Sequence, residues 1–170
     1  MLQIRELDAR MAQQHLPQLA DVLRDCVEGG ASVNFMWPFT QADAEAFFAK
    51  VIDNWGDRIL LAAFEEDRLI GTVQIIPATP PNQPHRADIA KLLVHRSARG
   101  KGVAQRLMEE VETVSRRIGK TLLVLDTVTG GTAERLYLRL GWTIAGVIPN
   151  YCVFPDGRLC GTTIFWKQLT

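Results

Sequence analysis

Apolar residues recur along this chain with two periods, and the change between them divides the chain into helices and strands. Helical spacing covers about residues 9–27, 40–55 and 103–118, and a shorter helix is expected at 132–140. Strands are expected at 2–5, 59–64, 69–76, 87–94, 121–126, 142–154 and 159–169. This order, β-α-α-β-β-β-α-β-α-β-β, predicts an α/β fold in which helices cover both faces of one mixed sheet.

Individual residues predict where the first two helices begin and end. Pro17 is expected to disturb the first helix, and Gly29 and Gly30 are expected to end it. Thr40 suits the N-cap of the second helix. The expected apolar face of that helix consists of Ala44, Phe47, Phe48, Val51, Ile52 and Trp55. Residues 31–39 form an irregular apolar loop between the two helices.

The three cysteines show no metal-ligand spacing, and neither do His15, His85 and His95. If Asp156 and Gly157 form a two-residue hairpin loop, Val153 lies opposite Cys160. Cys152 and Cys160 then face opposite sides of the sheet. We therefore expect three free thiols and no bound metal.

Length and charge narrow the class of protein. The chain has 170 residues, enough for one domain, so we expect residues 1–170 to form a single domain. Lys plus Arg and Asp plus Glu number 19 each, and this balance argues against nucleic-acid binding. No apolar run is long enough to span a bilayer, and the first residues lack the layout of a signal peptide. We expect a cytoplasmic protein without a membrane partner.

Residues 92–110 join a buried strand to a helix through a short loop rich in arginine and glycine. The loop, Arg99-Gly100-Lys101-Gly102-Val103-Ala104, has the pattern Arg-x-x-Gly-x-Ala. A glycine loop at the start of a helix presents several free backbone N–H groups at one point, at the positive end of the helix dipole. This arrangement suits a phosphate or pyrophosphate. The alternative is an ordinary strand–turn–helix junction with incidental basic residues. The spacing fits neither the nucleotide triphosphate loop nor the dinucleotide fingerprint.

This loop resembles the acyl-CoA pyrophosphate loop of the GNAT superfamily of N-acetyltransferases. A second motif, Ala133-x-x-Leu136-Tyr137-x-x-x-Gly141-Trp142, resembles the family motif on the helix beside the pantetheine arm. The resemblance spans essentially the whole chain and implies the GNAT fold, with acetyl-CoA as cosubstrate. The residues that it assigns to acetyl-CoA are Leu92, Leu93, Val94, Arg99, Gly100, Lys101, Gly102, Val103, Ala104 and Ala133.

A closer resemblance is to the tabtoxin-resistance acetyltransferases, which acetylate the amine of a small β-lactam amino-acid toxin. It is carried by residues 29–36, Lys91-Leu92, 97–100, 125–127 and 151–159. The resemblance implies that Asp88, Asp126 and Tyr137 lie near the reacting centre, and that the loop with Asn34, Phe35 and Met36 covers the acceptor. The first of the two acids is Glu in that subfamily and Asp88 here.

Acetyl transfer to an amine needs a group that takes a proton from the amine and one that assists the departing thiolate. Asp88 and Asp126 are candidates for the first task, as bases or as partners of the ammonium, and Tyr137 is the candidate for the second. Backbone N–H groups near Leu93 or Val94 are expected to polarise the thioester. The structural alternatives are a strand-end cap for Asp126, an ion pair with Arg86 or Lys91 for Asp88, and core packing for Tyr137.

The sequence therefore predicts an acetyl-CoA-dependent N-acetyltransferase that acts on a small polar amine by direct transfer in a ternary complex. An amino-acid-like β-lactam toxin is one candidate acceptor. Another amino acid, a polyamine or a protein N-terminus is an alternative acceptor, and a non-catalytic acyl-CoA-binding module is an alternative function. A homodimer is expected from the family resemblance alone.

Overall fold

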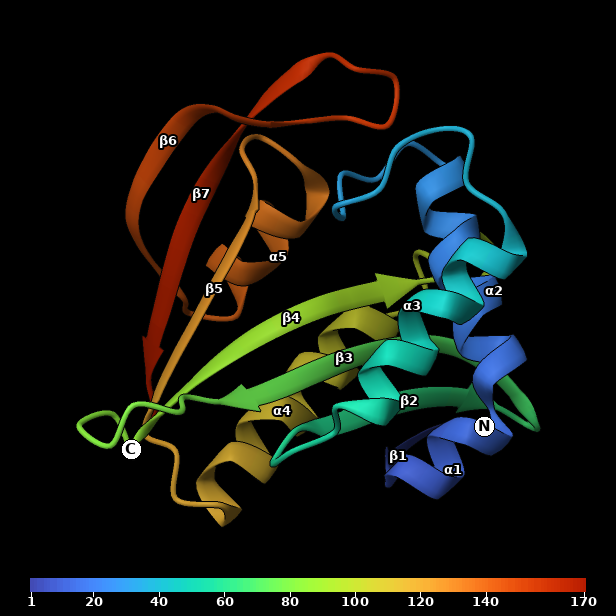
Figure 1. Ribbon diagram of the computed structural model, residues 1–170. Helices are drawn as coiled ribbons and strands as arrows, with labels where there is room; N and C mark the ends of the chain where they lie inside the picture. The colour runs from blue at the N-terminus through green and yellow to red at the C-terminus, as the bar shows by residue number, and fades with distance from the viewer.

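The computed structural model describes all residues from 1 to 170, which form one seven-stranded sheet with helices on both faces (Figure 1). The strands are β1 Leu2–Leu7, β2 Ile59–Glu65, β3 Arg68–Pro77, β4 Arg86–Val94, β5 Leu122–Val128, β6 Thr143–Val153 and β7 Leu159–Gln168. Their order in the sheet is β1-β2-β3-β4-β5-β7-β6. Only β4 and β5 are parallel neighbours, so the sheet is mixed as predicted.

Five α-helices divide between the two faces of the sheet (Figure 1). They are α1 Ala9–Gln14, α2 Leu16–Glu28, α3 Gln41–Asp53, α4 Val103–Arg117 and α5 Thr132–Arg139. The α2–α3 core joins buried side chains of α1, α2 and α3 to strands β1–β4. The α4 core, on the other face, joins α4 and α5 to β2–β5 and β7. None of these helices has both the length and the apolar character needed to cross a membrane.

The predicted order of elements is confirmed, and the differences lie at element ends. The first predicted helix is two helices, α1 and α2, which meet at His15, with Pro17 in the first turn of α2. Proline has no N–H to continue the earlier helix. Thr40 caps α3 as predicted, in a reciprocal capping box with Asp43. Trp55 lies beyond the end of α3, so its assignment to the helix is wrong, although it packs against the α2–α3 core.

The predicted register of the β6–β7 hairpin is wrong by one residue. Cys152 pairs directly with Cys160, and Val153 pairs with Leu159, so the turn runs from residue 154 to residue 158. A two-residue type I′ turn needs a positive φ at both central positions, and Gly157 has one whereas Asp156 does not. A shift of one residue reverses the relative side-chain directions, so the two thiols are neighbours on one face. All three cysteines are free thiols in this structure, but the predicted reason, opposite faces for Cys152 and Cys160, does not hold.

Candidate active site

An opening in the sheet between β4 and β5 is the central feature of the candidate site. These strands pair over only three residues, from Arg86 opposite Leu122 to Asp88 opposite Val124. Beyond this point β4 stays paired with β3 and β5 stays paired with β7, so the two strands diverge (Figure 1). We call the opening between residues 89–94 and 125–128 the strand gap. Openings at the carboxyl ends of parallel strands are where α/β sheets bind ligands.

A bulge in β4 turns Lys91 toward the face of the sheet that carries α3. The register with β3 shifts between Ala90 and Leu93, and Lys91 has a φ of 54°. Ile89 and Leu92 both pack against the α4 core, so the alternation of faces changes by one residue between them. The Lys91 ammonium lies 5.8 Å from the centre of the Phe47 ring of α3.

Asp126 faces the strand gap from β5. Leu123 and Leu125 pack in the α4 core, so Asp126 points to the opposite face, the same face as Lys91. Its Oδ2 accepts a hydrogen bond from Thr162 Oγ1 at 2.8 Å, and the residue is exposed. Burial lowers the pKa of Lys91 below its usual value, and the Asp126 charge acts in the opposite direction. A cation and an anion thus face one opening from its two sides.

Asp88 occupies the last paired position before the strand gap opens. Its Oδ1 accepts a hydrogen bond from Arg86 Nη1 at 2.8 Å, as one structural alternative anticipated. Asp126 has no such cationic partner in hydrogen-bond contact. Of the two predicted acids, Asp126 is therefore the one whose carboxylate is available to an amine in the gap.

Tyr137 lies on α5 with its ring in the α4 core, packed beside Trp142 and Phe165 at centroid distances of 5.9 and 5.6 Å. Burial, and secondarily the Asp126 charge, raise the pKa of its phenol well above the usual range. The hydroxyl therefore stays protonated at every working pH. No hydrogen bond within the chain engages it, and it is not among the fully enclosed polar atoms that lack a partner. Tyr137 is thus a core residue that keeps a free proton donor.

The glycine loop forms a row of unpaired backbone N–H groups. Gly100 and Gly102 have φ values of 75° and 77°, and Gly102 is the N-cap of α4 without any capping side chain. The N–H groups of residues 100–105 have no partner within the chain, and the first turn of α4 holds no acidic residue. Consecutive free N–H groups at a helix N-terminus fit the pyrophosphate of a coenzyme A thioester.

The side chains assigned to the coenzyme differ in what they can contribute. Val103 and Leu93 are buried in the two cores, so only their backbone atoms are available. Arg99 folds back: its Nε donates to the Val94 carbonyl at 3.2 Å, and its Nη2 lies 3.8 Å from Cys26 Sγ. Lys101 lies 3.5 Å from Glu65 in an exposed ion pair.

The remaining assigned residues lie around the same loop and gap. Leu92 and Val94 are half-buried on the α4 side of β4, beyond the point where its pairing with β5 ends. Ala104 follows Val103 in the first turn of α4, and its N–H is one of the unpaired donors. Ala133 lies in the first turn of α5 and is half-buried against the α4 core.

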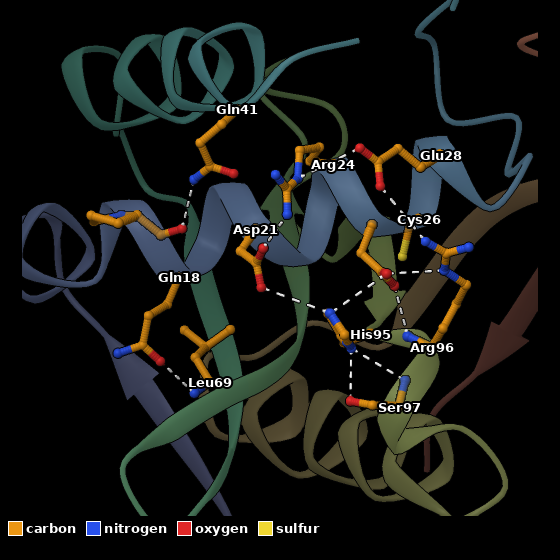
Figure 2. Close-up of polar contacts among 12 residues, drawn as sticks. Gln18, Asp21, Arg24, Cys26, Glu28, Gln41, Leu69, His95, Arg96 and Ser97 are labelled. Atoms are coloured by element: carbon orange, nitrogen blue, oxygen red, sulfur yellow. Dashed lines mark hydrogen bonds and ion pairs between the residues drawn. The ribbon is translucent and has the colours of Figure 1, made fainter.

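Asp25 of α2 joins the helix to the start of the glycine loop. Its carboxylate accepts hydrogen bonds from Arg96 N at 2.7 Å and Arg96 Nε at 2.9 Å, and His95 Nε2 lies 3.5 Å away. Figure 2 shows His95, Arg96 and Ser97 gathered against α2, with His95 Nδ1 2.8 Å from Ser97 Oγ. Burial by itself raises the pKa of Asp25, but Arg96 and His95 outweigh it and hold that pKa below its usual value.

We expect Asp25→Asn to lower the free energy of unfolding by about 1.5–3 kcal/mol at pH 7, because it weakens charge-assisted hydrogen bonds to Arg96. A carboxylate whose pKa is lowered by folding stabilises the fold above its unfolded pKa, near 3.8. That contribution is lost as the pH falls through the lower, folded-state pKa. Urea unfolding from pH 7 to pH 3 should therefore show the difference between wild type and variant shrinking below about pH 4.

Asp21→Asn is the matched control, since Asp21 lies on the same helix and its ion pairs, with Arg24 at 2.8 Å and with His95 at 3.8 Å, involve a carboxylate that is far more exposed than that of Asp25. Its cost should stay below about 1 kcal/mol. Equal costs for the two variants at pH 7 would contradict the role of Asp25.

The loop between α2 and α3 carries the predicted acceptor residues and contacts the β6–β7 hairpin. Phe35 stacks on Phe39 at 4.6 Å and meets Phe47 edge-on at 5.3 Å, whereas Asn34 and Met36 are exposed. The aromatic cluster borders an open hollow of about 390 Å³ beside α3. Neither Asp126 nor Tyr137 lines this hollow, so it is separate from the strand gap.

Sequence reasoning missed Lys91 as a site residue and Asp25 and His95 as supports of the loop. A positive φ at a lysine has no local sequence signal, because glycine and asparagine are the residues that usually adopt it. Asp25 and Arg96 are 71 positions apart, and no periodicity connects them. The Lys91-Leu92 pair in the family resemblance was the only available signal for Lys91.

The geometry defines a class of protein: an α/β fold in which a helix N-terminus with unpaired backbone N–H groups lies beside an opening between two parallel strands. The chain matches the model of the acetyltransferase (GNAT) family over residues 17–142. It belongs to that family, and it is an N-acetyltransferase whose acyl donor is acetyl-CoA.

Solved structures share this fold at low sequence identity. A candidate acetyltransferase from Salmonella typhimurium, solved with its cofactor acetyl-CoA, is 20% identical, with a TM-score of 0.78 over 99% of this chain and 94% of that one. The ribosomal-protein-alanine N-acetyltransferase of Brucella melitensis is 22% identical, with a TM-score of 0.77 over 98% and 99%. A candidate phosphinothricin N-acetyltransferase is 17% identical, with a TM-score of 0.81 over 100% and 99%.

Proposed function

We propose that this enzyme acetylates the amine of a small, amino-acid-like molecule that carries an acidic group beside the amine. The carrying observation is the pairing of charges at the strand gap: the Asp126 carboxylate on β5 and the Lys91 ammonium on the bulge of β4 face the same opening. An ammonium and an acid group on one small acceptor complement this arrangement, whereas a polyamine offers nothing to Lys91.

The Lys91 ammonium has no counter-ion in direct contact, although it feels the Asp126 charge across the gap. No hydrogen bond or ion pair within the chain engages its ammonium, which lies over the face of the Phe47 ring. Withdrawing a cation from water is costly unless it is paired, and burial accordingly lowers the pKa of Lys91. A carboxylate or similar group on the acceptor would supply the partner and retain the charge.

The catalytic role that we propose for each side chain follows from its surroundings. Asp126 holds the acceptor ammonium and, directly or through water, takes one proton from it so that the amine can attack. Acetyl-CoA, when bound at residues 100–105, supplies an acetyl group activated as a thioester. Tyr137 donates a hydrogen bond to the developing thiolate. Its raised pKa makes full proton transfer to that thiolate unfavourable, because the conjugate thiol has a pKa of about 8.5.

Within this class, the β-lactam amino-acid toxins of the tabtoxin-resistance enzymes are the narrower proposal. It is supported by the motifs at residues 29–36 and 151–159 and by the place of Asn34, Phe35 and Met36 on the loop beside the hairpin. Structures named for phosphinothricin and for ribosomal-protein alanine share the fold equally well, so fold likeness does not choose between small and protein acceptors.

The test is a thiol-release assay with acetyl-CoA over matched acceptors: amino acids, their carboxamides and polyamines. We expect the acids to be preferred, and we expect Lys91→Met to raise their KM roughly 10- to 100-fold, the equivalent of one charge-assisted hydrogen bond. The KM of the carboxamides should change little, because they lack the charge that Lys91 pairs. Methionine keeps the unbranched shape at a position with positive φ.

Asp88→Asn and Asp126→Asn form a second matched pair in the same assay. Asp126→Asn should lower turnover and spare acetyl-CoA affinity, and Asp88→Asn should do so more weakly because Arg86 already occupies its carboxylate. A wild-type preference for polyamines, or an equal rise in KM for acids and carboxamides in Lys91→Met, would refute the acidic acceptor.

We further propose that the enzyme acts in the cytoplasm and as a homodimer. The support for the first is the set of three free thiols. The support for the second is the edge strand β6, which exposes Ile144, Val147, Ile148 and Tyr151.

A further inference from the structure

Cys152 and Cys160 form a pair of neighbouring thiols outside the candidate active site. They are directly opposite residues of the antiparallel β6–β7 hairpin, and their Sγ atoms are 3.3 Å apart. Opposite Cα atoms in such a ladder are about 4.5–5.5 Å apart, within the roughly 4.4–6.8 Å that a disulfide spans. Rotation of the two side chains, which brings the sulfurs from 3.3 Å to bonding distance, is therefore the main change that closure requires.

Ser32 of the loop between α2 and α3 covers this thiol pair. Its Oγ lies 3.5 Å from Cys152 Sγ and 3.7 Å from Cys160 Sγ, and it donates to the Val153 carbonyl at 3.0 Å. A second bond, from Trp37 N to the Pro155 carbonyl at 3.2 Å, holds the same hairpin end to the same loop (Figure 1). The pair thus lies at the joint between the hairpin and the segment that carries Asn34, Phe35 and Met36.

We propose that Cys152 and Cys160 form an oxidisable dithiol that closes to an intramolecular disulfide when it meets a low-molecular-weight disulfide such as oxidised glutathione. Cys152 is half-buried and Cys160 is only 7% exposed, so Cys152 meets the reagent first. Burial and the neighbouring Cys152 thiol raise the pKa of Cys160, which keeps it protonated at neutral pH and unreactive toward the reagent itself.

The reaction balances in two exchanges. The Cys152 thiolate attacks one sulfur of the glutathione disulfide, so that a mixed disulfide forms and one glutathione thiolate leaves. Cys160 Sγ then gives up its proton and attacks Cys152 Sγ, which forms the protein disulfide and expels the second glutathione thiolate. The protein loses two hydrogen atoms, and one molecule of oxidised glutathione becomes two of the reduced form.

Cys26 is an internal comparison, because its thiol contacts Val94 and Arg99 and neither cysteine of the pair. Cys26 is 2% exposed, donates to the Val94 carbonyl and has no second cysteine beside it. Incubation of the folded protein with oxidised glutathione should therefore remove two of its three thiols and leave Cys26. Thiol titration after denaturation, intact mass and non-reducing peptide mapping measure this outcome.

Cys152→Ser and Cys160→Ser test the assignment, and Cys26→Ser is the matched control. The intact mass of oxidised wild type and Cys26→Ser should fall by two hydrogen atoms with no bound glutathione. Cys152→Ser should stay unmodified, and Cys160→Ser should stop at the mixed disulfide. Retention of all three thiols, a persistent glutathione adduct on wild type, or disulfide-linked dimers would each overturn the proposal.

Steady-state kinetics test how formation of the disulfide affects the enzyme, and this part of the inference rests on the proposed function. Oxidation of wild type should change the KM for the amine acceptor, because the hairpin end contacts the acceptor loop, and dithiothreitol should restore it. The KM for acetyl-CoA should stay constant, since the glycine loop lies on other elements. An unchanged acceptor KM in fully oxidised protein would refute this consequence, while the thiol count decides the disulfide separately.

Discussion

Tyr137→Phe is expected to lower turnover roughly 10- to 1,000-fold, which lies within or just below the usual span of general acid catalysis, because the variant loses the hydrogen bond to the departing thiolate. The phenyl ring keeps its packing beside Trp142 and Phe165, so the free energy of unfolding should change by about 1 kcal/mol or less. The hydroxyl makes no hydrogen bond within the chain, so its removal leaves no buried group without a partner. Steady-state kinetics and urea unfolding on the same samples separate the two effects.

The leaving group supplies the decisive control for Tyr137. A thioester whose thiol is more acidic forms a thiolate that needs less help, so it should recover part of the lost rate in Tyr137→Phe. Tyr151→Phe is a further comparison, since Tyr151 is the only other tyrosine and is 57% exposed on β6. Full turnover in folded Tyr137→Phe, measured where chemistry limits the rate, would leave Tyr137 a core residue only.

Gly102→Val is expected to weaken acetyl-CoA binding by roughly tenfold or more. A β-branched residue at a φ of 77° is strained by about 1–2 kcal/mol, and the strain is relieved by moving the N–H groups that must face the pyrophosphate. No atom of the protein lies within 4 Å of an added Cβ, so the new side chain enters the space in front of the loop. Isothermal calorimetry with acetyl-CoA measures the loss.

Gly119→Val is the matched control for Gly102→Val. Gly119 follows the other end of α4, has a φ of 75° and is equally open around its Cβ. It should cost similar stability and leave acetyl-CoA affinity unchanged. Arg99→Ala should cost about 1–3 kcal/mol of binding energy if its guanidinium turns from Val94 to the pyrophosphate. Wild-type affinity in both Gly102→Val and Arg99→Ala would refute the loop as the pyrophosphate site.

The sequence by itself determined the order of the elements and the position of the glycine loop. Apolar periodicity reflects which face of each element is buried, and that is a local property of α4 or β5. The need for glycine at residues 100 and 102 is equally local, because it follows from the φ of the residue itself. The capping box at Thr40 and the break before Pro17 depend on neighbours within a few positions.

Only the tertiary structure decided which charged and nucleophilic groups meet. Lys91 faces Asp126 because a bulge shifts β4 by one residue where it leaves β5, and Asp25 reaches Arg96 because α2 packs across the end of β4. The register of Cys152 and Cys160 depends on the backbone angles of a turn for which the sequence allows two lengths. These contacts join residues distant in sequence or depend on a one-residue shift in register. Neither apolar periodicity nor motif spacing contains information about such pairings.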